Sequence, residues 1–96
     1  MRLRGKTDGN HAAIVRALRQ AGASVVSLAD IGNGCPDLLV GFRGTNLLLE
    51  VKDGSLPPSR QKLTADEYRF HQEWSGAVVL VRSIEEALRE LQQTDW

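Results

Sequence analysis

Residues 36–52, which read PDLLVGFRGTNLLLEVK, decide the fold of this chain. Two runs of strand-forming residues, 37–42 and 47–52, flank the polar segment RGTN at 43–46. Glycine and asparagine between two such runs are typical of a tight turn. The segment therefore predicts an antiparallel β-hairpin with its turn at 43–46.

Charged residues occupy the end of this hairpin that lies away from the turn. Side chains alternate faces along a strand, so Glu50 and Lys52 share one face, opposite to that of Leu49 and Val51. In a hairpin the start of one arm lies opposite the end of the other arm. We therefore expect Asp37, Glu50 and Lys52 to converge at one end of the sheet.

Capping residues and apolar spacing predict five more elements around the hairpin. They are a helix at 7–22, capped by Thr7 or Asp8 and ended by Gly22; a strand at 23–28; a helix at about 64–74; an apolar strand at 77–81, expected to be covered on both faces; and a helix that begins at Ser83. Thr64–Glu67 and Ser83–Glu86 have the spacing of capping boxes. The order α-β-β-β-α-β-α predicts an α/β fold in which helices flank a small mixed sheet.

Composition limits the class of protein. The chain has 96 residues, 42% of them hydrophobic and 25% charged, which is enough for one packed domain spanning 1–96. No apolar run is long enough to span a membrane. One cysteine excludes an internal disulfide framework, and with two histidines it disfavours a structural zinc site. We expect a soluble, cytoplasmic protein.

The net charge is zero, but it is unevenly distributed. Residues 1–62 carry nine Lys/Arg and five Asp/Glu, whereas residues 63–96 carry three and seven. A neutral total disfavours unspecific coating of nucleic acid, yet it leaves room for a basic face.

Two carboxylates at one strand end require an explanation. Asp37 and Glu50 would repel each other unless a cation lay between them. Mg²⁺ prefers oxygen ligands and supports phosphodiester hydrolysis by activating water and neutralising charge. The alternative is a surface ion pair of Glu50 with Lys52 or Arg60.

The spacing of Pro36-Asp37 and Glu50-Val51-Lys52 resembles the signature of PD-(D/E)XK nucleases. The wider stretches GCPDLLVG at 34–41, LEVKDG at 49–54 and LTADE at 63–67 resemble the virus-type replication-repair nuclease (VRR-NUC) domain in its short stand-alone form. The resemblance covers about 8–91 and implies the restriction-endonuclease-like core fold.

The resemblance also implies a role for each motif residue. Asp37 and Glu50 would bind Mg²⁺ or Mn²⁺ together with the backbone carbonyl of Val51, and Lys52 would be the catalytic lysine. Related enzymes place a glutamate in the first helix; here the candidates for that position are Asn10, which is uncharged, and Asp8. Further candidates outside the motif are Glu67, which stands where the family often has a glutamine, and the phosphate-binding cations Lys6, Arg60 and Lys62.

These features predict a metal-dependent endodeoxyribonuclease. Stand-alone members of the family resemble homodimeric Holliday-junction resolvases, and a twofold dimer suits a four-way junction. The resemblance also implies a virus- or phage-encoded protein. The alternatives are a nuclease for flaps or other branched DNA, a non-catalytic nucleic-acid-binding module on the same fold, and a plain structural domain.

Overall fold

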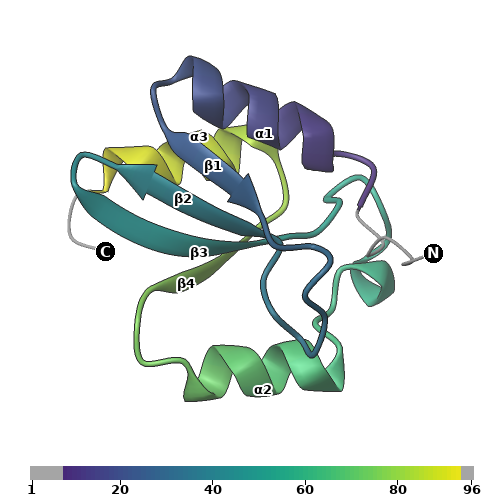
Figure 1. The fold of residues 1–96 in the computed structure, drawn as a ribbon. Coiled ribbons are helices and arrows are strands. Elements are labelled where there is room, and N and C mark those ends of the chain that lie inside the picture. Colours follow the sequence, from purple (N-terminus) through teal and green to yellow (C-terminus); the bar gives the residue numbers. More distant parts are fainter. Residues whose placement is uncertain (1–7, 94–96) are drawn as a thin grey trace.

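The computed structural model describes residues 8–93, which form a small α/β fold with one four-stranded mixed sheet (Figure 1). The strands are β1 (Ser24–Ser27), β2 (Leu38–Phe42), β3 (Thr45–Val51) and β4 (Val78–Val81), and they lie in this order across the sheet. The first three pair antiparallel, and β4 pairs parallel to β3. The predicted mixed sheet and its flanking helices are therefore confirmed at the level of the α/β class.

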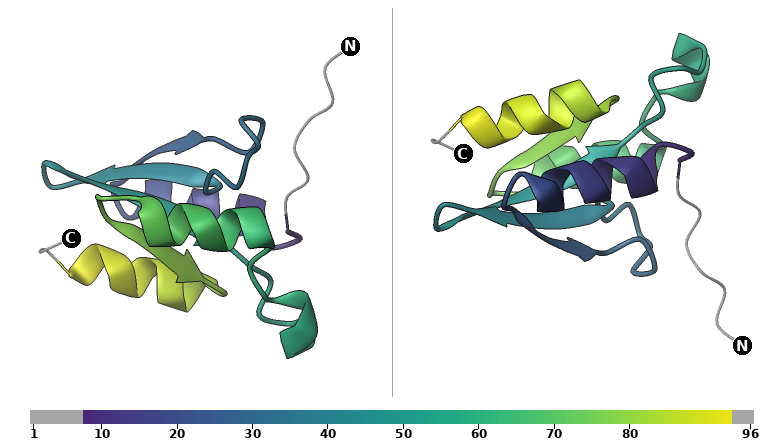
Figure 2. Two further views of the ribbon diagram at one scale, coloured as in Figure 1. Left: turned by 90° about the horizontal axis from the view of Figure 1, so that it is seen from below. Right: turned by 90° about the horizontal axis from the view of Figure 1, so that it is seen from above.

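Helices cover the two faces of the sheet unequally. The helices α1 (His11–Gln20) and α3 (Ile84–Gln92) lie side by side on one face of the sheet. The helix α2 (Ala65–Glu73), which follows β3 and precedes β4 in the chain, lies on the other face (Figures 1 and 2). The buried core lies under α1 and α3 and includes Ile14, Leu18 and Leu91. By contrast, α2 has no buried residue. The face that carries α2 is thus the open face of the sheet.

Helix α1 is shorter than the predicted 7–22. It begins at His11 because the carboxylate of Asp8 does not cap it; Asn10 is the N-cap residue and makes no side-chain capping bond. Thr7 lies outside the described residues. The predicted end is confirmed: Gly22 has φ +99°, its N–H donates to Arg19 O (3.0 Å), and the Ala23 N–H donates to Leu18 O (3.0 Å). These two bonds form a Schellman motif.

The hairpin turn is tighter than predicted. Phe42 pairs with Thr45, so only Arg43 and Gly44 form the loop, with φ +52° and +82°. Positive φ at both positions is the geometry of a type I′ turn, whose twist matches that of the two strands. The short turn fixes the register that brings Leu38 opposite Leu49.

Two predictions about the C-terminal part need correction. The strand at 77–81 was expected to be covered on both faces, but β4 is an edge strand, and only Val81 is buried. The box at Ser83 is only half formed. Its hydroxyl accepts from the Glu86 N–H, but the Glu86 carboxylate accepts from the N–H of Arg82 instead of that of Ser83. The box at Thr64 and Glu67 is complete.

The loop from 53 to 62 contains one short 3₁₀ turn, Pro58–Arg60. Among residues 8–93, no helix combines the length and the apolar character that crossing a bilayer requires.

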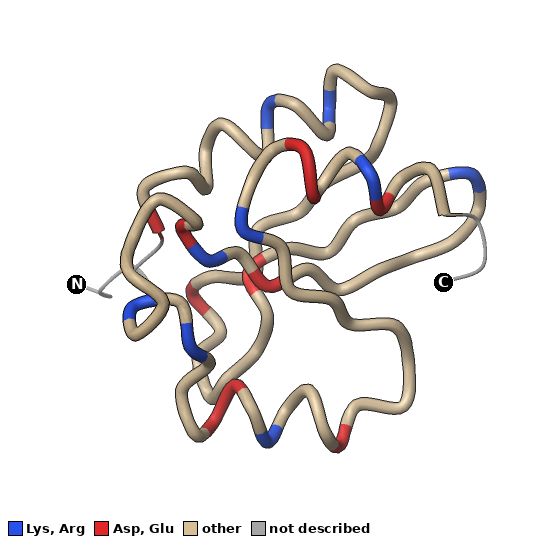
Figure 3. The backbone as a smooth tube through the Cα atoms, turned by 180° about the vertical axis from the view of Figure 1, so that it is seen from behind, with Lys and Arg blue, Asp and Glu red and all other residues tan. Residues whose placement is uncertain are grey.

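Figure 3 shows basic and acidic segments on both helical layers, with acidic segments near the centre of the tube and at the loop end of the sheet. The charge is therefore interspersed over the fold.

Candidate active site

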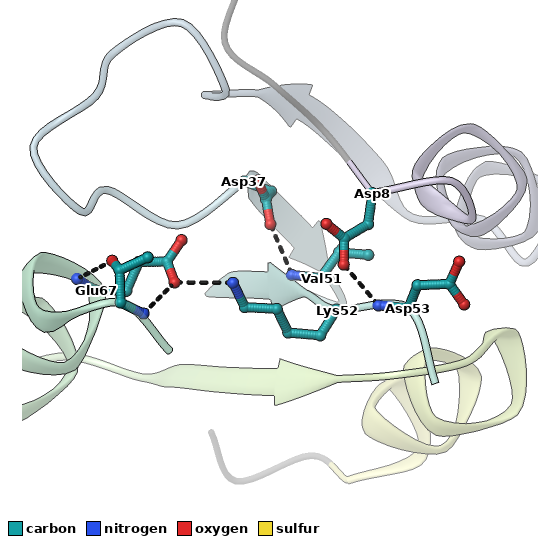
Figure 4. Close-up of polar contacts among 7 residues, drawn as sticks. Asp8, Asp37, Val51, Lys52, Asp53 and Glu67 are labelled. Atoms are coloured by element: carbon teal, nitrogen blue, oxygen red, sulfur yellow. Dashed lines mark hydrogen bonds and ion pairs between the residues drawn. The ribbon is translucent and has the colours of Figure 1, made fainter. Parts of the chain in front are cut away.

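Pro36 and Asp37 create a break in the sheet ladder at the start of β2. Continuing the β2–β3 register from Leu38 and Leu49 places Pro36 opposite Val51. Proline has no N–H, so it offers no donor to the Val51 carbonyl. The other main-chain group of Val51, its N–H, donates to the side-chain atom Asp37 Oδ2 (2.7 Å; Figure 4). The strand end thus presents a carboxylate and a main-chain carbonyl to the same region.

Glu50 is the one charged residue buried among those described, at 2% exposure. Its Oε1 atom accepts no hydrogen bond from any described residue. Burial, followed by the charge of Asp37 and a hydrogen bond to the Asp37 side chain, raises the pKa of Glu50 from 4.5 to about 9. Continuing the β2–β3 register places Asp37 opposite Glu50, so their side chains lie on the same face of the sheet. With its pKa raised in this way, Glu50 is protonated at neutral pH.

Lys52 lies on the same face as Glu50 and is held by Glu67. The Lys52 Nζ atom donates to Glu67 Oε1 at 2.8 Å, and both side chains are less than one-fifth exposed. Burial alone would lower the pKa of Lys52, but the hydrogen bond and charge of Glu67, with the charges of Glu50 and Asp8, raise it above its usual value. Lys52 therefore keeps its proton.

Glu67 is fixed from two sides. Besides accepting from Lys52, its Oε1 atom accepts from the Thr64 N–H (2.9 Å) as part of the capping box. Burial would raise the pKa of Glu67, but these contacts with Lys52 and Thr64 lower it below its usual value. The start of α2 thus positions the lysine at the end of β3 (Figure 4).

The candidates for a fourth site position, Asp8 and Asn10, lie against the chain that follows β3. Asp8 Oδ2 accepts from the Asp53 N–H (2.6 Å), and Asn10 Nδ2 donates to the carbonyls of Lys52 (3.2 Å) and Arg82 (3.1 Å). Within the described residues neither forms a hydrogen bond or ion pair with Asp37 or Glu50. Their observed role is to anchor the start of α1 beside the site.

The loop before β2 closes the site against α2. A Cβ atom on Gly34 would lie 2.3 Å from the carbonyl oxygen of Asp66, and Gly34 has φ +78°. Glycine is needed here both for the close approach and for the backbone conformation. Cys35 follows, and burial together with the charges of Glu50 and Asp37 raises the pKa of its thiol. Cys35 is thus a protonated wall residue beside the two carboxylates.

The predicted DNA-contacting cations are only partly described. Lys6 lies outside the described residues. Arg60 ends the 3₁₀ turn and Lys62 follows it; both are exposed. The structure places them on the segment that leads into α2, on the open side of the sheet.

The donor set fits a small oxygen-preferring divalent cation. No group of three or more His, Cys, Asp and Glu side chains among residues 8–93 is arranged to hold a metal ion. The protein ligands here would be two facing carboxylates and the Val51 carbonyl, with solvent completing the shell. Mg²⁺ is commonly bound by one or two carboxylates with several retained waters. The Glu50 oxygen that lacks a donor is the feature such an ion would satisfy.

No protein-family model, curated protein or solved structure matches this chain. The assignment of the site therefore rests on its residues and their geometry. Sequence reasoning gave Glu67 little weight as a functional residue, although the structure pairs it with Lys52. The capping box fixes the Glu67 carboxylate at the start of α2, but it does not indicate Lys52 as the partner.

Proposed function

We propose that this protein is a divalent-metal-dependent endonuclease that hydrolyses DNA phosphodiesters. The observation that carries the proposal is the buried Glu50 carboxyl, facing Asp37, with no donor to its Oε1 atom among the described residues. Like charges are not placed together in a protein interior without compensation. Without an ion, the proton held by Glu50 supplies that compensation, and a cation ligated by both carboxylates would replace this proton.

Each motif residue has a separate task in this proposal. Asp37 and Glu50 would hold Mg²⁺ or Mn²⁺ with the Val51 carbonyl, and Glu50 would have to give up its proton to do so. The bound ion would activate water and neutralise charge on the phosphate. The hydrogen bond from the Val51 N–H keeps one Asp37 oxygen in place, so the ligand geometry is set before the ion arrives.

The raised pKa of Lys52 restricts its role. An ammonium that stays protonated cannot take a proton from water, so Lys52 acts as a hydrogen-bond donor and a positive charge toward the phosphate. Glu67 orients this ammonium through the 2.8 Å contact. Glu67 is therefore a positioning residue.

A finer proposal rests on the resemblance of the motif residues Pro36-Asp37 and Glu50-Val51-Lys52 to the PD-(D/E)XK signature. We propose a VRR-NUC-like member of the PD-(D/E)XK nucleases that acts on branched DNA, with a four-way junction cut by a homodimer as the leading case. In this proposal DNA shape and dimer geometry supply selectivity, and flap cleavage is the nearest variant.

One observation favours a second candidate, a non-catalytic nucleic-acid-binding module. Lys52 is already neutralised by Glu67, as in an ordinary structural ion pair. In that case the carboxyl pair would hold no ion during function. DNA binding would then be indifferent to Mg²⁺, and no substrate would be cut.

Cleavage assays separate the two candidates. Labelled four-way junction, flap and linear duplex DNA are incubated with Mg²⁺ or Mn²⁺, using wild type, Lys52→Ala and a control, Arg89→Ala, which removes an exposed cation on α3. We expect cleavage that is lost with EDTA and in Lys52→Ala but retained in Arg89→Ala. Junction binding without cleavage of any substrate would overturn the nuclease and support the binding module.

A further inference from the structure

A groove of about 530 Å³ opens on the α2 side of the sheet, between α2, β4 and the loop after β3. Its lining includes Lys62, Tyr68, Leu80 and Arg82. The volume lies within the range of about 300–1,000 Å³ that is usual for ligand sites. None of these four side chains forms part of the proposed catalytic set.

The groove begins one strand away from the candidate catalytic carboxylates. Glu50 pairs with Leu80 in the parallel β3–β4 ladder, so their side chains lie on the same face of the sheet. Adjacent strands are separated by about 4.8 Å. The apolar floor of the groove therefore adjoins Glu50 directly.

The groove presents one aromatic ring and two cations to solvent. Tyr68 is 58% exposed although it is a large aromatic residue. Within residues 8–93, neither the Lys62 ammonium nor the Arg82 guanidinium forms an ion pair. Aromatic rings beside positive charges are the features that bind unpaired nucleotides, because bases stack on the ring and phosphates contact the cations.

One wall of the groove is held in place by Gln61. Its side-chain amide donates to the carbonyls of Leu56 (2.6 Å) and Gly54 (3.4 Å). The Gly54 N–H in turn donates to the carbonyl of Arg82 (3.0 Å). These bonds tie the backbone of the loop to the backbone at the end of β4.

We propose that this groove is a subsite for an unpaired DNA nucleotide adjoining the cleaved phosphodiester, with Tyr68 stacking on the base and Lys62 and Arg82 contacting phosphate. This inference rests on the proposed nuclease function and narrows its substrate to DNA with a single-stranded segment beside the cleavage position. A flap or an opened junction has such a segment, and a continuous duplex does not.

Binding without metal tests the subsite separately from catalysis. Fluorescence anisotropy in EDTA measures the affinity for a labelled oligothymidylate of about ten nucleotides and for a matched duplex. We expect Tyr68→Ala to weaken oligothymidylate binding by about tenfold and to leave duplex binding unchanged. Tyr68→Phe should bind like wild type, because stacking needs the ring alone.

The control is Trp74→Ala, which removes an exposed aromatic just after α2 and outside this groove. Equal oligothymidylate affinity in Tyr68→Ala and wild type, or an equal loss in Trp74→Ala, would overturn the subsite even if the protein cleaves DNA. Conversely, a selective loss in Tyr68→Ala from a protein that cuts no substrate would support the subsite and overturn the nuclease.

Discussion

Glu50→Gln should make the protein more stable at neutral pH while removing its affinity for divalent cations. Glutamine has nearly the shape of glutamic acid, but it cannot ionise. At neutral pH the wild-type protein must take up a proton at Glu50 when it folds, and the substitution removes that cost. An ordinary buried residue behaves in the opposite way, because its replacement usually destabilises the fold.

The size of the effect follows from the pKa of Glu50, which is 4.5 ordinarily and about 9 in the folded protein. Between these values the folded state binds more protons than the unfolded chain. The stability that the neutral carboxyl contributes is therefore complete below 4.5 and is lost as the pH rises toward 9. At about pH 7.5 the loss spans about 3 pH units, or about 4 kcal/mol at about 1.4 kcal/mol per unit. This is an upper limit, because it assigns the whole pKa difference to Glu50 alone.

Urea unfolding in EDTA, followed by circular dichroism, measures this difference as a function of pH. We expect Glu50→Gln to match wild type near pH 4.5 and to exceed it by about 2–4 kcal/mol at about pH 7.5. Glu73→Gln removes an exposed carboxylate on α2 and should show no such pH-dependent gain. A Glu50→Gln difference that does not change with pH, or a loss of stability at neutral pH, would show that Glu50 is not held protonated in the folded protein.

Two further predictions concern the positioning of the site. Glu67→Gln retains an acceptor for the capping box but removes the charge beside Lys52, so the pKa of Lys52 should fall. NMR titration of the Lys52 side chain measures this, and an unchanged pKa would show that Glu67 does not control the lysine. Gly34→Ala should lower the free energy of unfolding more than Gly32→Ala, because both have positive φ but only Gly34 meets the Asp66 carbonyl. The left-handed backbone conformation alone costs alanine about 1–2 kcal/mol at either position. Equal losses in urea unfolding would show that the contact with the Asp66 carbonyl adds no further cost.

Local chemical patterns in the sequence were sufficient to predict much of this fold. Glycine at 22 and 44, the Thr64–Glu67 box and the alternation around Glu50 each specify a backbone or a face through contacts within a few residues. The convergence of Asp37 with Glu50 follows from the hairpin register alone, since Leu38 pairs with Leu49.

Features that depend on distant contacts were missed. The carboxylate of Asp8 accepts from the N–H of Asp53, 45 residues away, and so it does not cap α1. Strand β4 reads as fully buried because its residues are apolar, but its position at the sheet edge is set by topology. The pairing of Lys52 with Glu67 requires the path of the chain from β3 to α2, which no local pattern contains.

Mn²⁺ binding measures whether Asp37 and Glu50 together hold a divalent cation. Electron paramagnetic resonance of free Mn²⁺ gives the affinity and stoichiometry for wild type, Glu50→Gln and Asp37→Asn, with Glu73→Gln as the control. We expect one Mn²⁺ site per chain in wild type and in the Glu73→Gln control, and we expect that site to be lost in Glu50→Gln and in Asp37→Asn. Equal Mn²⁺ binding by all four proteins, or by none, would contradict this expectation.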